Sequence, residues 1–119
     1  MNSFVVINNI STTPNGKINN KKYNKFCIYI IKNKNILLKE IYIGSTKNFS
    51  SRKSQHKKNT YNKRKKSYHR RLYRYIREHG GWDNFDMEIL EYYPCDTIKE
   101  GQCIEFDYID QMKPELNII

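Results

Sequence analysis

The pattern of apolar and polar positions predicts an antiparallel hairpin in the first third of the chain. Residues 26–31 and 36–43 are rich in Ile, Leu, Phe and Tyr, and polar residues 32–35 separate them, as is typical of two strands joined by a turn. Side chains alternate between the faces of a strand, so Tyr29 shares a face with Ile31, and Tyr42 with Gly44. If the register brings Tyr29 near Tyr42, two phenols converge at one end of the hairpin; otherwise both are ordinary strand residues.

A helix is expected directly after the hairpin, at residues 49–58. Phe49, Arg52 and His56 fall at positions i, i+3 and i+7 and therefore lie on one helix face. An arginine and a histidine beside two phenols suit phosphate, because Arg offers a planar donor fork and His carries protons near neutral pH. Taken alone, each would be an ordinary surface group. Gly44 permits either a close backbone approach or an unusual φ where the strand stops, and residues able to cap the helix follow it: Ser45, Thr46 and Asn48.

The middle of the chain is predicted to contain an exposed loop, a second helix and a third strand. Residues 59–67 are polar and charged and form the loop. Residues 68–79 have a helical period, and Gly80-Gly81 ends that helix. Residues 85–91 alternate as a strand with one buried face does. The face of the second helix that is expected to pack consists of Tyr68, Leu72, Tyr75, Ile76 and His79.

The last predicted helix, residues 97–112, carries one acidic residue where apolar residues are expected. At 100° per residue, Glu105 falls near the centre of an arc made of Ile98, Gly101, Ile104, Tyr108, Ile109 and Met112. A carboxylate there is costly to bury unless it is paired or binds a cation. One explanation is a salt bridge, with Arg52 as the partner. In a phosphate-binding chain, the better explanation is a ligand for Mg²⁺ or another hard cation, which often uses only one or two protein carboxylates.

Length and composition favour one small intracellular domain. We expect a polar N-terminal arm at 1–24, with an edge strand at 4–7 as one option, and a single domain at 25–119. No apolar run approaches the ~18 residues that span a bilayer, and no signal-peptide pattern is present, so we expect a soluble protein of the cytoplasm, or of the nucleus in a eukaryotic host. The three cysteines, at 27, 95 and 103, form no Cys-x-x-Cys pair and are expected to be reduced and mostly structural.

The net charge of +10 is concentrated in one segment. Residues 47–77 contain 13 Lys or Arg and no acidic residue, whereas the rest has 9 basic against 12 acidic residues. Such a segment is typical of a nucleic-acid binder, because each basic side chain that reaches a phosphate releases counterions. A solvated basic surface, or a nuclear-localisation run at 63–66, is the plainer interpretation. The residues expected to contact DNA are Lys47, Lys53, Lys57, Lys63, Arg64, Lys65, Lys66, His69, Arg70, Arg71 and Arg74.

Two tripeptides, and the order of the residues after them, resemble the GIY-YIG nuclease superfamily. The matching residues are Cys27-Ile28-Tyr29, Tyr42-Ile43-Gly44, Arg52, His56, Glu105-Phe106-Asp107-Tyr108-Ile109 and Leu116-Asn117. Either tripeptide alone is weak evidence, but the ordered set is specific and covers most of the chain, about 26–117. Cys27 departs from the usual glycine; it adds a small side chain and removes no catalytic group. The run at 76–85 is similar to small stand-alone members carried by viruses and mobile elements.

The resemblance implies both a fold and a reaction. The fold is α/β of the α+β kind, a small three-stranded antiparallel sheet flanked by helices, and the reaction is metal-dependent cleavage of DNA phosphodiester bonds. The metal is Mg²⁺ or Mn²⁺, and no organic cofactor is expected. DNA is the expected partner, and a homodimer is one way in which so small a chain could gain sequence specificity. The family's functional positions fall on Tyr29, Tyr42, Gly44, Arg52, His56, Glu105 and Asn117.

These residues predict a mechanism with one point left open. Glu105 holds a single cation, and Tyr42 orients or deprotonates the attacking water, with Tyr29 and His56 positioning it or sharing the proton. A phenol is a poor base at neutral pH, so Tyr42 needs a cationic neighbour, for which Arg52 is the candidate. His56 as the primary base is the main rival. Asn117 either fixes geometry through its amide or lines the metal site, and Gly44 is structural.

Two other classes of function compete with this prediction. In a noncatalytic nucleic-acid-binding module, the tyrosines and Glu105 would be core residues, and the basic segment alone would matter. In an interaction protein, the same segment would bind acidic partners. The ordered set of catalytic residues favours the nuclease over both.

Overall fold

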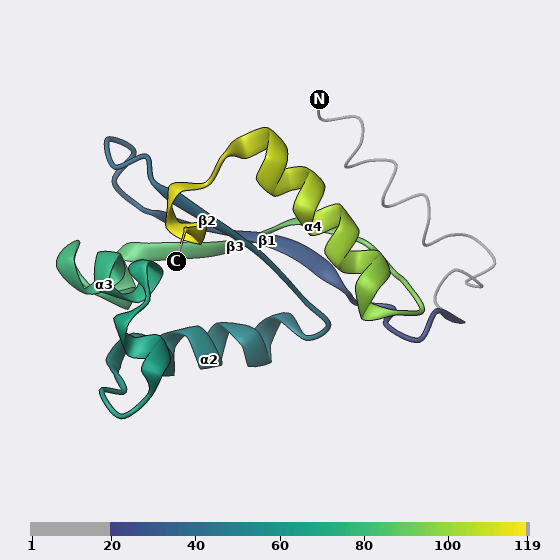
Figure 1. The fold of residues 1–119 in the computed structure, drawn as a ribbon, viewed down its shortest axis with the longest axis horizontal. Coiled ribbons are helices and arrows are strands. Elements are labelled where there is room, and N and C mark those ends of the chain that lie inside the picture. The colour runs from purple at the N-terminus through teal and green to yellow at the C-terminus, as the bar shows by residue number, and fades with distance from the viewer. Residues whose placement is uncertain (1–19, 119) are drawn as a thin grey trace.

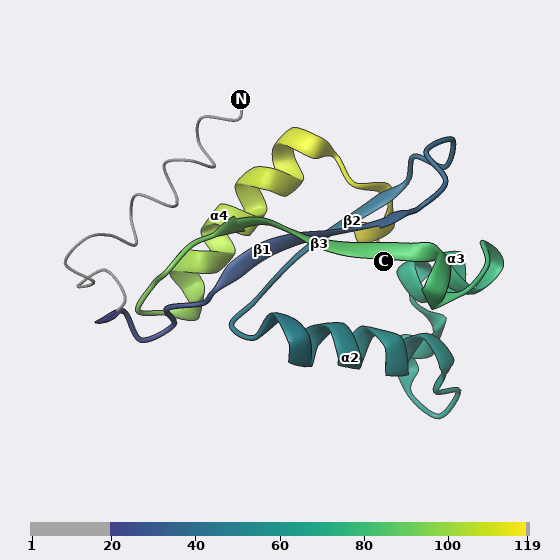
Figure 2. The same cartoon turned by 180° about the vertical axis from the view of Figure 1, so that it is seen from behind.

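The computed structural model describes residues 20–118, in which helices cover both faces of a three-stranded sheet (Figures 1 and 2). The elements in chain order are β1 (Cys27–Asn33), β2 (Ile41–Thr46), α2 (Phe49–Tyr61), the 3₁₀ helix η2 (Lys66–His69), α3 (Arg71–Glu78), η3 (Trp82–Asn84), β3 (Phe85–Tyr92), α4 (Ile98–Met112) and η4 (Glu115–Asn117). Strand β1 lies between β2 and β3 and is antiparallel to both. The predicted α+β fold is confirmed. Most of the predicted N-terminal arm, including 4–7, lies outside the described residues.

Strand β1 is buried on both faces, which explains its nearly continuous apolar sequence. One face carries Tyr29 and Ile31 into a cluster with residues of α3, η3 and η4. The other face carries Ile28 and Ile30 against apolar residues of α4. Figures 1 and 2 show the same arrangement, with α4 on one side of the sheet and α2 and α3 on the other. The central strand therefore holds two layers of helices together.

The hairpin forms, but its second strand begins five residues later than predicted, at Ile41. Two apolar residues assigned to that strand, Ile36 and Leu37, are 85% and 78% exposed. The side chains of Asn33 and Asn35 accept hydrogen bonds from the backbone within the connection, which stabilises a wide polar turn. The prediction of a short turn at 32–35 is therefore wrong. The apolar character of residues 36–38 placed the start of β2 too early.

Helix α2 is longer than predicted and includes residues expected in an exposed loop. Asn48 caps its N-terminus by accepting a hydrogen bond from the Ser51 backbone. The helix continues to Tyr61, and Asn59 and Thr60 are buried although both are polar. The Thr60 hydroxyl donates to the His56 carbonyl, which satisfies it inside the protein. The prediction that Asn59 and Thr60 lie in an exposed loop is therefore wrong, because these polar side chains form hydrogen bonds inside the protein.

The second helix is shorter than predicted, and its buried face differs. α3 begins at Arg71, and the preceding residues form η2. Its buried residues are Leu72, Tyr73 and Ile76, whereas Tyr75 and His79 are half-buried and stack on each other. The two glycines after it have φ values of 101° and 86°, as expected where a helix ends.

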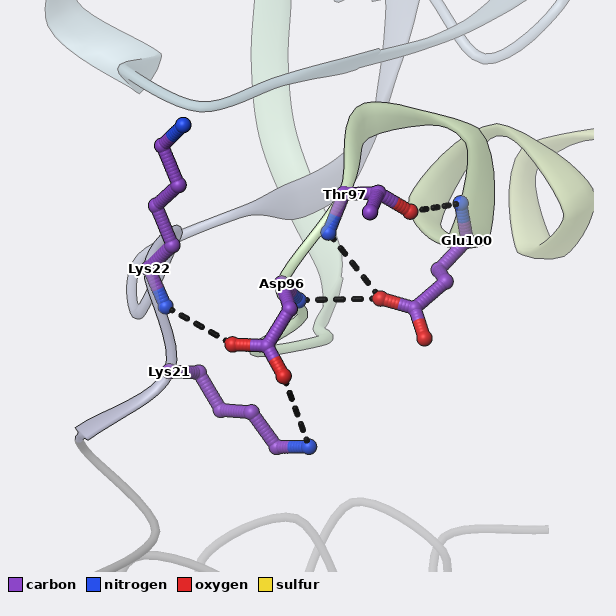
Figure 3. Close-up of polar contacts among 5 residues, drawn as sticks. All are labelled: Lys21, Lys22, Asp96, Thr97 and Glu100. Atoms are coloured by element: carbon purple, nitrogen blue, oxygen red, sulfur yellow. Dashed lines mark hydrogen bonds and ion pairs between the residues drawn. The ribbon is translucent and has the colours of Figure 1, made fainter.

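Helix α4 begins with a capping box and is anchored to the start of the described chain (Figure 3). The Thr97 hydroxyl accepts a hydrogen bond from the Glu100 backbone, and the Glu100 carboxylate accepts from the backbone of Thr97 and Asp96. Asp96 in turn accepts from the Lys22 backbone and pairs with the Lys21 ammonium at 3.6 Å. These contacts fix the position of α4 against the sheet.

All three cysteines are free; Cys27 and Cys95 are buried, and Cys103 is exposed. Within residues 20–118, none of the helices has both the length and the apolar character needed to cross a membrane.

Replacing Gly101 with alanine is expected to lower the free energy of unfolding by about 1–2 kcal/mol, because overpacking outweighs the gain in helix propensity. A Cβ at this position would lie 2.1 Å from Cε1 of the buried Phe26 ring. Urea denaturation measures the difference. The exposed neighbour Gln102, also changed to alanine, is the control and should not lose stability. An equally stable or more stable Gly101→Ala protein would contradict this packing.

Candidate active site

Three aromatic rings meet where the hairpin packs on α2. The register pairs Tyr29 with Gly44 and Ile31 with Tyr42, so the two tyrosines lie diagonally on one face. Their ring centroids are 6.4 Å apart, and the His56 ring lies 5.7 Å from each. The register is thus the one in which the two phenols converge.

Gly44 is required by the position of the Tyr29 ring. A Cβ on residue 44 would lie 2.5 Å from both Cζ and the hydroxyl oxygen of Tyr29, a separation that atoms in a packed protein cannot adopt. Without a side chain, β2 lets the phenol lie directly against its backbone. This close approach, rather than an unusual φ, explains the glycine at this position.

His56 is fully buried and hydrogen-bonded through both ring nitrogens. Its Nε2 lies 2.7 Å from the Tyr29 hydroxyl, and its Nδ1 lies 2.7 Å from the Tyr73 hydroxyl. Burial, together with the positive charges of Arg52 and Arg70, lowers the pKa of His56 to about 3. The imidazole is therefore neutral at physiological pH and enclosed between two phenols.

Arg52 supplies positive charge to the phenols from the same helix. It is half-buried, and its Nη1 donates to the Gln55 side chain at 2.6 Å. Burial raises the pKa of both Tyr29 and Tyr42, and the Arg52 charge opposes that rise at each. Both phenols are accordingly protonated at neutral pH in the protein alone.

Glu105 is half-buried beside β2 and accepts a hydrogen bond from the Ser45 hydroxyl. Burial raises the pKa of its carboxyl, while the Ser45 hydrogen bond and the Arg52 charge oppose the rise. Within residues 20–118, the three ion pairs join other residues, so the salt bridge considered between Glu105 and Arg52 does not form. Met112, placed on the same buried arc by the sequence, is 40% exposed.

The carboxylate and the phenols approach the edge strand from opposite faces. Ser45 and Tyr42 are three residues apart on β2, so their side chains point to opposite sides. Helix α4 packs on the side to which Ser45 points, and α2 on the other. The charge of Glu105 nevertheless contributes to raising the pKa of Tyr42, which places the two groups within electrostatic range. The candidate site therefore straddles β2.

Asn117 completes this edge by imitating a neighbouring strand. Its Oδ1 accepts from the Ile43 backbone N–H at 2.8 Å, and its Nδ2 donates to the Ile43 carbonyl at 2.7 Å. Of the two roles predicted for Asn117, these contacts correspond to fixing geometry through the amide.

The basic residues predicted to contact DNA all lie on the surface. Each is exposed, as expected of side chains available to a partner; they are Lys47, Lys53, Lys57, Lys63, Arg64, Lys65, Lys66, His69, Arg70, Arg71 and Arg74. Arg77, in the same cationic segment, instead lies 3.6 Å above the Tyr68 ring and donates to the Thr60 carbonyl. That arginine has a structural role.

Three polar residues of the site were not singled out by the sequence. Ser45 was expected only as a cap, Tyr73 falls one residue away from the predicted face of its helix, and Asn59 was placed in an exposed loop. Asn59 and His56 are three residues apart, and a longer helix would have placed both on one face. Nothing in the sequence distinguishes Tyr73 from the other tyrosines in the basic segment.

The neutral state of His56 makes stability depend on pH. Its folded-state pKa of about 3 lies below the 6.5 of an ordinary histidine, so the unfolded chain binds the extra proton first as the pH falls. The contribution of neutral His56 to the free energy of unfolding is complete above pH 6.5. Below pH 6.5 it is lost at up to about 1.4 kcal/mol per pH unit. Urea denaturation between about pH 7 and pH 5 should show the stability advantage of wild type over His56→Gln shrinking. An advantage independent of pH would contradict a buried neutral imidazole.

Comparison with known proteins agrees with this geometry. The family model of the GIY-YIG catalytic domain matches residues 25–117, a range that includes both tripeptides, Glu105 and Asn117. No curated protein and no solved structure is significantly similar to the chain. On the family match, which covers most of its length, the chain belongs to the GIY-YIG catalytic-domain family.

Proposed function

We propose that this protein is a metal-dependent endonuclease that hydrolyses DNA phosphodiester bonds with a single Mg²⁺ or Mn²⁺ ion. Its family implies a nuclease-type function; the metal, the DNA substrate and the residue roles are the proposal. The observation that carries it is the convergence of Tyr29, Tyr42 and His56 around one end of the hairpin, with Arg52 within electrostatic range of both phenols. The nuclease domain is assigned to residues 25–119 and the N-terminal arm to 1–24.

Glu105 fits a cation that takes few protein ligands. Within residues 20–118, no group of three or more His, Cys, Asp or Glu side chains is placed to hold a metal ion. Mg²⁺ commonly keeps several waters and binds one or two carboxylates plus substrate phosphates. Glu105 is half-buried and oriented by Ser45, and a cation beside it would offset the burial that raises its pKa. A divalent ion bound there would supply positive charge, which stabilises the negative charge that develops on the phosphate.

Tyr42 is better placed than His56 to meet the attacking water. His56 has 0% exposure and both of its nitrogens are hydrogen-bonded, whereas Tyr42 is only partly buried. The protonated Tyr42 phenol orients the water through its hydroxyl but cannot take a second proton. It acts as a base only as the phenolate, after its own proton has passed to solvent, and Arg52 and Arg70 favour that form because their charges oppose the burial that raises its pKa. Arg52 also stabilises charge on the phosphate.

The surface beside Tyr42 suits a nucleic-acid backbone. A recess of about 160 Å³ lies between α3, β2 and η4 and is lined in part by Tyr42, Arg70, Arg71 and Asn117. Guanidinium groups bind phosphate through paired donors. Most of the other exposed basic residues lie on α2, on η2 and in the segment between them. So many positive charges in one part of the chain support a long polyanion as the substrate.

Removing the carboxylate is expected to abolish cleavage and leave DNA binding intact. Glu105→Gln keeps the side-chain shape but removes the charge that would hold the cation, so nicking of supercoiled plasmid with Mg²⁺ should fall at least ~100-fold. The matched control is Asp107→Asn, which removes one exposed charge from the same helix and should cleave normally. Equal nicking by wild type and Glu105→Gln would refute the metal role.

The same assay separates the competing functions. A noncatalytic nucleic-acid-binding module would bind the plasmid in a salt-sensitive way, and wild type would show no metal-dependent nicking. A protein that uses its basic surface on acidic partners would show no length-dependent DNA binding. Either result would overturn the proposed function.

Tyr42→Phe and His56→Gln distinguish the two candidate bases. Tyr42→Phe should lower kcat at least ~100-fold, because the hydroxyl that orients the water is lost. His56→Gln should have a smaller effect, since His56 acts through Tyr29. Single-turnover cleavage and DNA binding are measured for both, with folding checked by circular dichroism. If only the histidine change abolishes cleavage in a folded, DNA-binding protein, the assignment to Tyr42 is wrong.

A further inference from the structure

The turn that connects β1 and β2 holds two large aliphatic side chains in solvent. Ile36 and Leu37 are 85% and 78% exposed, and among the large apolar residues of 20–118 they are the most exposed. Single exposed apolar residues are common on protein surfaces. An adjacent pair at the tip of a hairpin is instead a candidate contact surface, and neither side chain has a role in the proposed cleavage.

Hydrogen bonds hold the backbone of this turn in one conformation. The Asn35 side chain accepts from the Leu37 N–H at 3.0 Å, and the Asn35 carbonyl accepts from the Leu38 N–H at 3.0 Å. At the base of the turn, the Lys34 N–H donates to the Asn84 carbonyl at 2.8 Å. The two aliphatic side chains are therefore presented at a defined place, which lowers the entropic cost of binding a partner.

The charges next to the aliphatic pair are positive. Lys34 and Lys39 flank it, both are exposed, and segment 34–39 contains no acidic residue. Within residues 20–118, neither ammonium group belongs to an ion pair, whereas the nearby Lys32 pairs with Glu88 at 3.1 Å. A groove of about 440 Å³ lies beside the tip, and Asp86 is the acidic residue that lines it. The tip itself therefore suits an anionic partner.

A second copy of the chain fits this surface poorly. It would bring Lys34 and Lys39 toward another strongly positive protein, since the net charge is +10. Two side chains also bury far less than the ~800 Å² per partner of a stable protein interface.

The position of the tip favours DNA, because the tip lies next to the surface proposed to bind it. The Tyr75 hydroxyl of α3 donates to the Glu40 carboxylate, just after the turn, at 2.9 Å. Figures 1 and 2 show the turn and α3 at the same end of the molecule, and α3 carries the exposed Arg71 and Arg74. Five residues separate Leu37 from Tyr42, so their Cα atoms are at most about 18 Å apart. That distance is about five base pairs of a duplex.

Aliphatic side chains can contact DNA in few ways. They have no hydrogen-bond donor or acceptor, so they cannot read the polar edges of the bases. They gain most from the apolar faces of bases, which become accessible when a base step opens in the minor groove. Proteins that open a step in this way combine an apolar wedge with basic groups on the phosphates and kink the duplex.

We propose that residues 34–39 form a DNA wedge, in which Ile36 and Leu37 enter the minor groove and open a base step while Lys34 and Lys39 contact the flanking phosphates. The duplex is then kinked within about five base pairs of the phosphodiester bond that lies at Tyr42. This proposal rests on the proposed DNA substrate but does not require cleavage.

Bending of a short duplex with donor and acceptor dyes at its two ends tests the wedge. Excess chelator prevents metal-dependent cleavage, and binding of the full-length wild type should raise the energy transfer between the dyes. Ile36→Ser/Leu37→Ser should bind about tenfold more weakly, because apolar burial is lost, and should leave the energy transfer unchanged. The control Phe106→Ser, which removes a 61% exposed ring from α4, should bind and bend DNA as wild type does. Circular dichroism checks the folding of each variant.

The salt dependence of binding tests the role of the lysines. Lys34→Gln/Lys39→Gln removes two phosphate contacts, so the slope of log K against log salt concentration should become shallower by about 1.8. Ile36→Ser/Leu37→Ser removes no charge and should keep the wild-type slope. An unchanged slope in the lysine variant would refute the phosphate contacts.

The outcomes separate the wedge from the proposed function. If wild type and Ile36→Ser/Leu37→Ser bind and bend DNA equally, the wedge is refuted and the DNA substrate stands. If wild type does not bind DNA, the proposed function fails and the wedge fails with it.

Two further measurements identify other partners of the tip. Vesicles of anionic phospholipid that bind wild type but not Ile36→Ser/Leu37→Ser, with no bending of DNA, would assign the tip to a membrane surface and refute the wedge. A wild-type dimer that becomes a monomer in the same variant, measured by sedimentation, would show that a second copy covers the tip and would also refute it.

Discussion

The contact between the Tyr29 ring and the bare backbone of Gly44 is the constraint on which the candidate site depends. It lets a phenol on the central strand lie across the edge strand. From there the hydroxyl reaches His56 on α2, and the ring lies 6.4 Å from that of Tyr42. A side chain at residue 44 would push the phenol away from both. One glycine thereby couples the sheet to the helix that carries Arg52 and His56.

The second half of the site depends on how α4 docks on the other face. Its capping box, the anchoring of Asp96 and the contact of Gly101 with Phe26 fix the helix against the sheet. Only then can Glu105 reach the hydroxyl of Ser45 on β2. The carboxylate and the phenols thus belong to different layers and meet at the edge strand, which Asn117 completes. A candidate site built this way requires the whole fold.

Period and spacing predicted the sheet and the helices, and they placed Arg52 and His56 on one helix face. They left open whether Tyr29 meets Tyr42, because that depends on the strand register. Period and spacing failed where polar residues are buried in pairs. The polar sequence around Asn59 predicts a loop, because it does not show that Asn59 contacts Tyr73, fourteen positions away. Likewise the apolar residues Ile36 and Leu37 predict a strand, but the Asn33 and Asn35 side chains stabilise a turn instead. Such outcomes depend on contacts between distant segments, which periodicity does not contain.

Cleavage of covalently closed circular DNA by wild-type protein, with Mg²⁺ or with excess chelator, decides whether the protein is a metal-dependent endonuclease. A closed circle has no ends, so only an endonuclease can open it. We expect nicked and then linear DNA with Mg²⁺, and intact circles with chelator. Opening at the same rate in chelator, or no opening with Mg²⁺ although the protein binds the DNA, would refute a metal-dependent endonuclease.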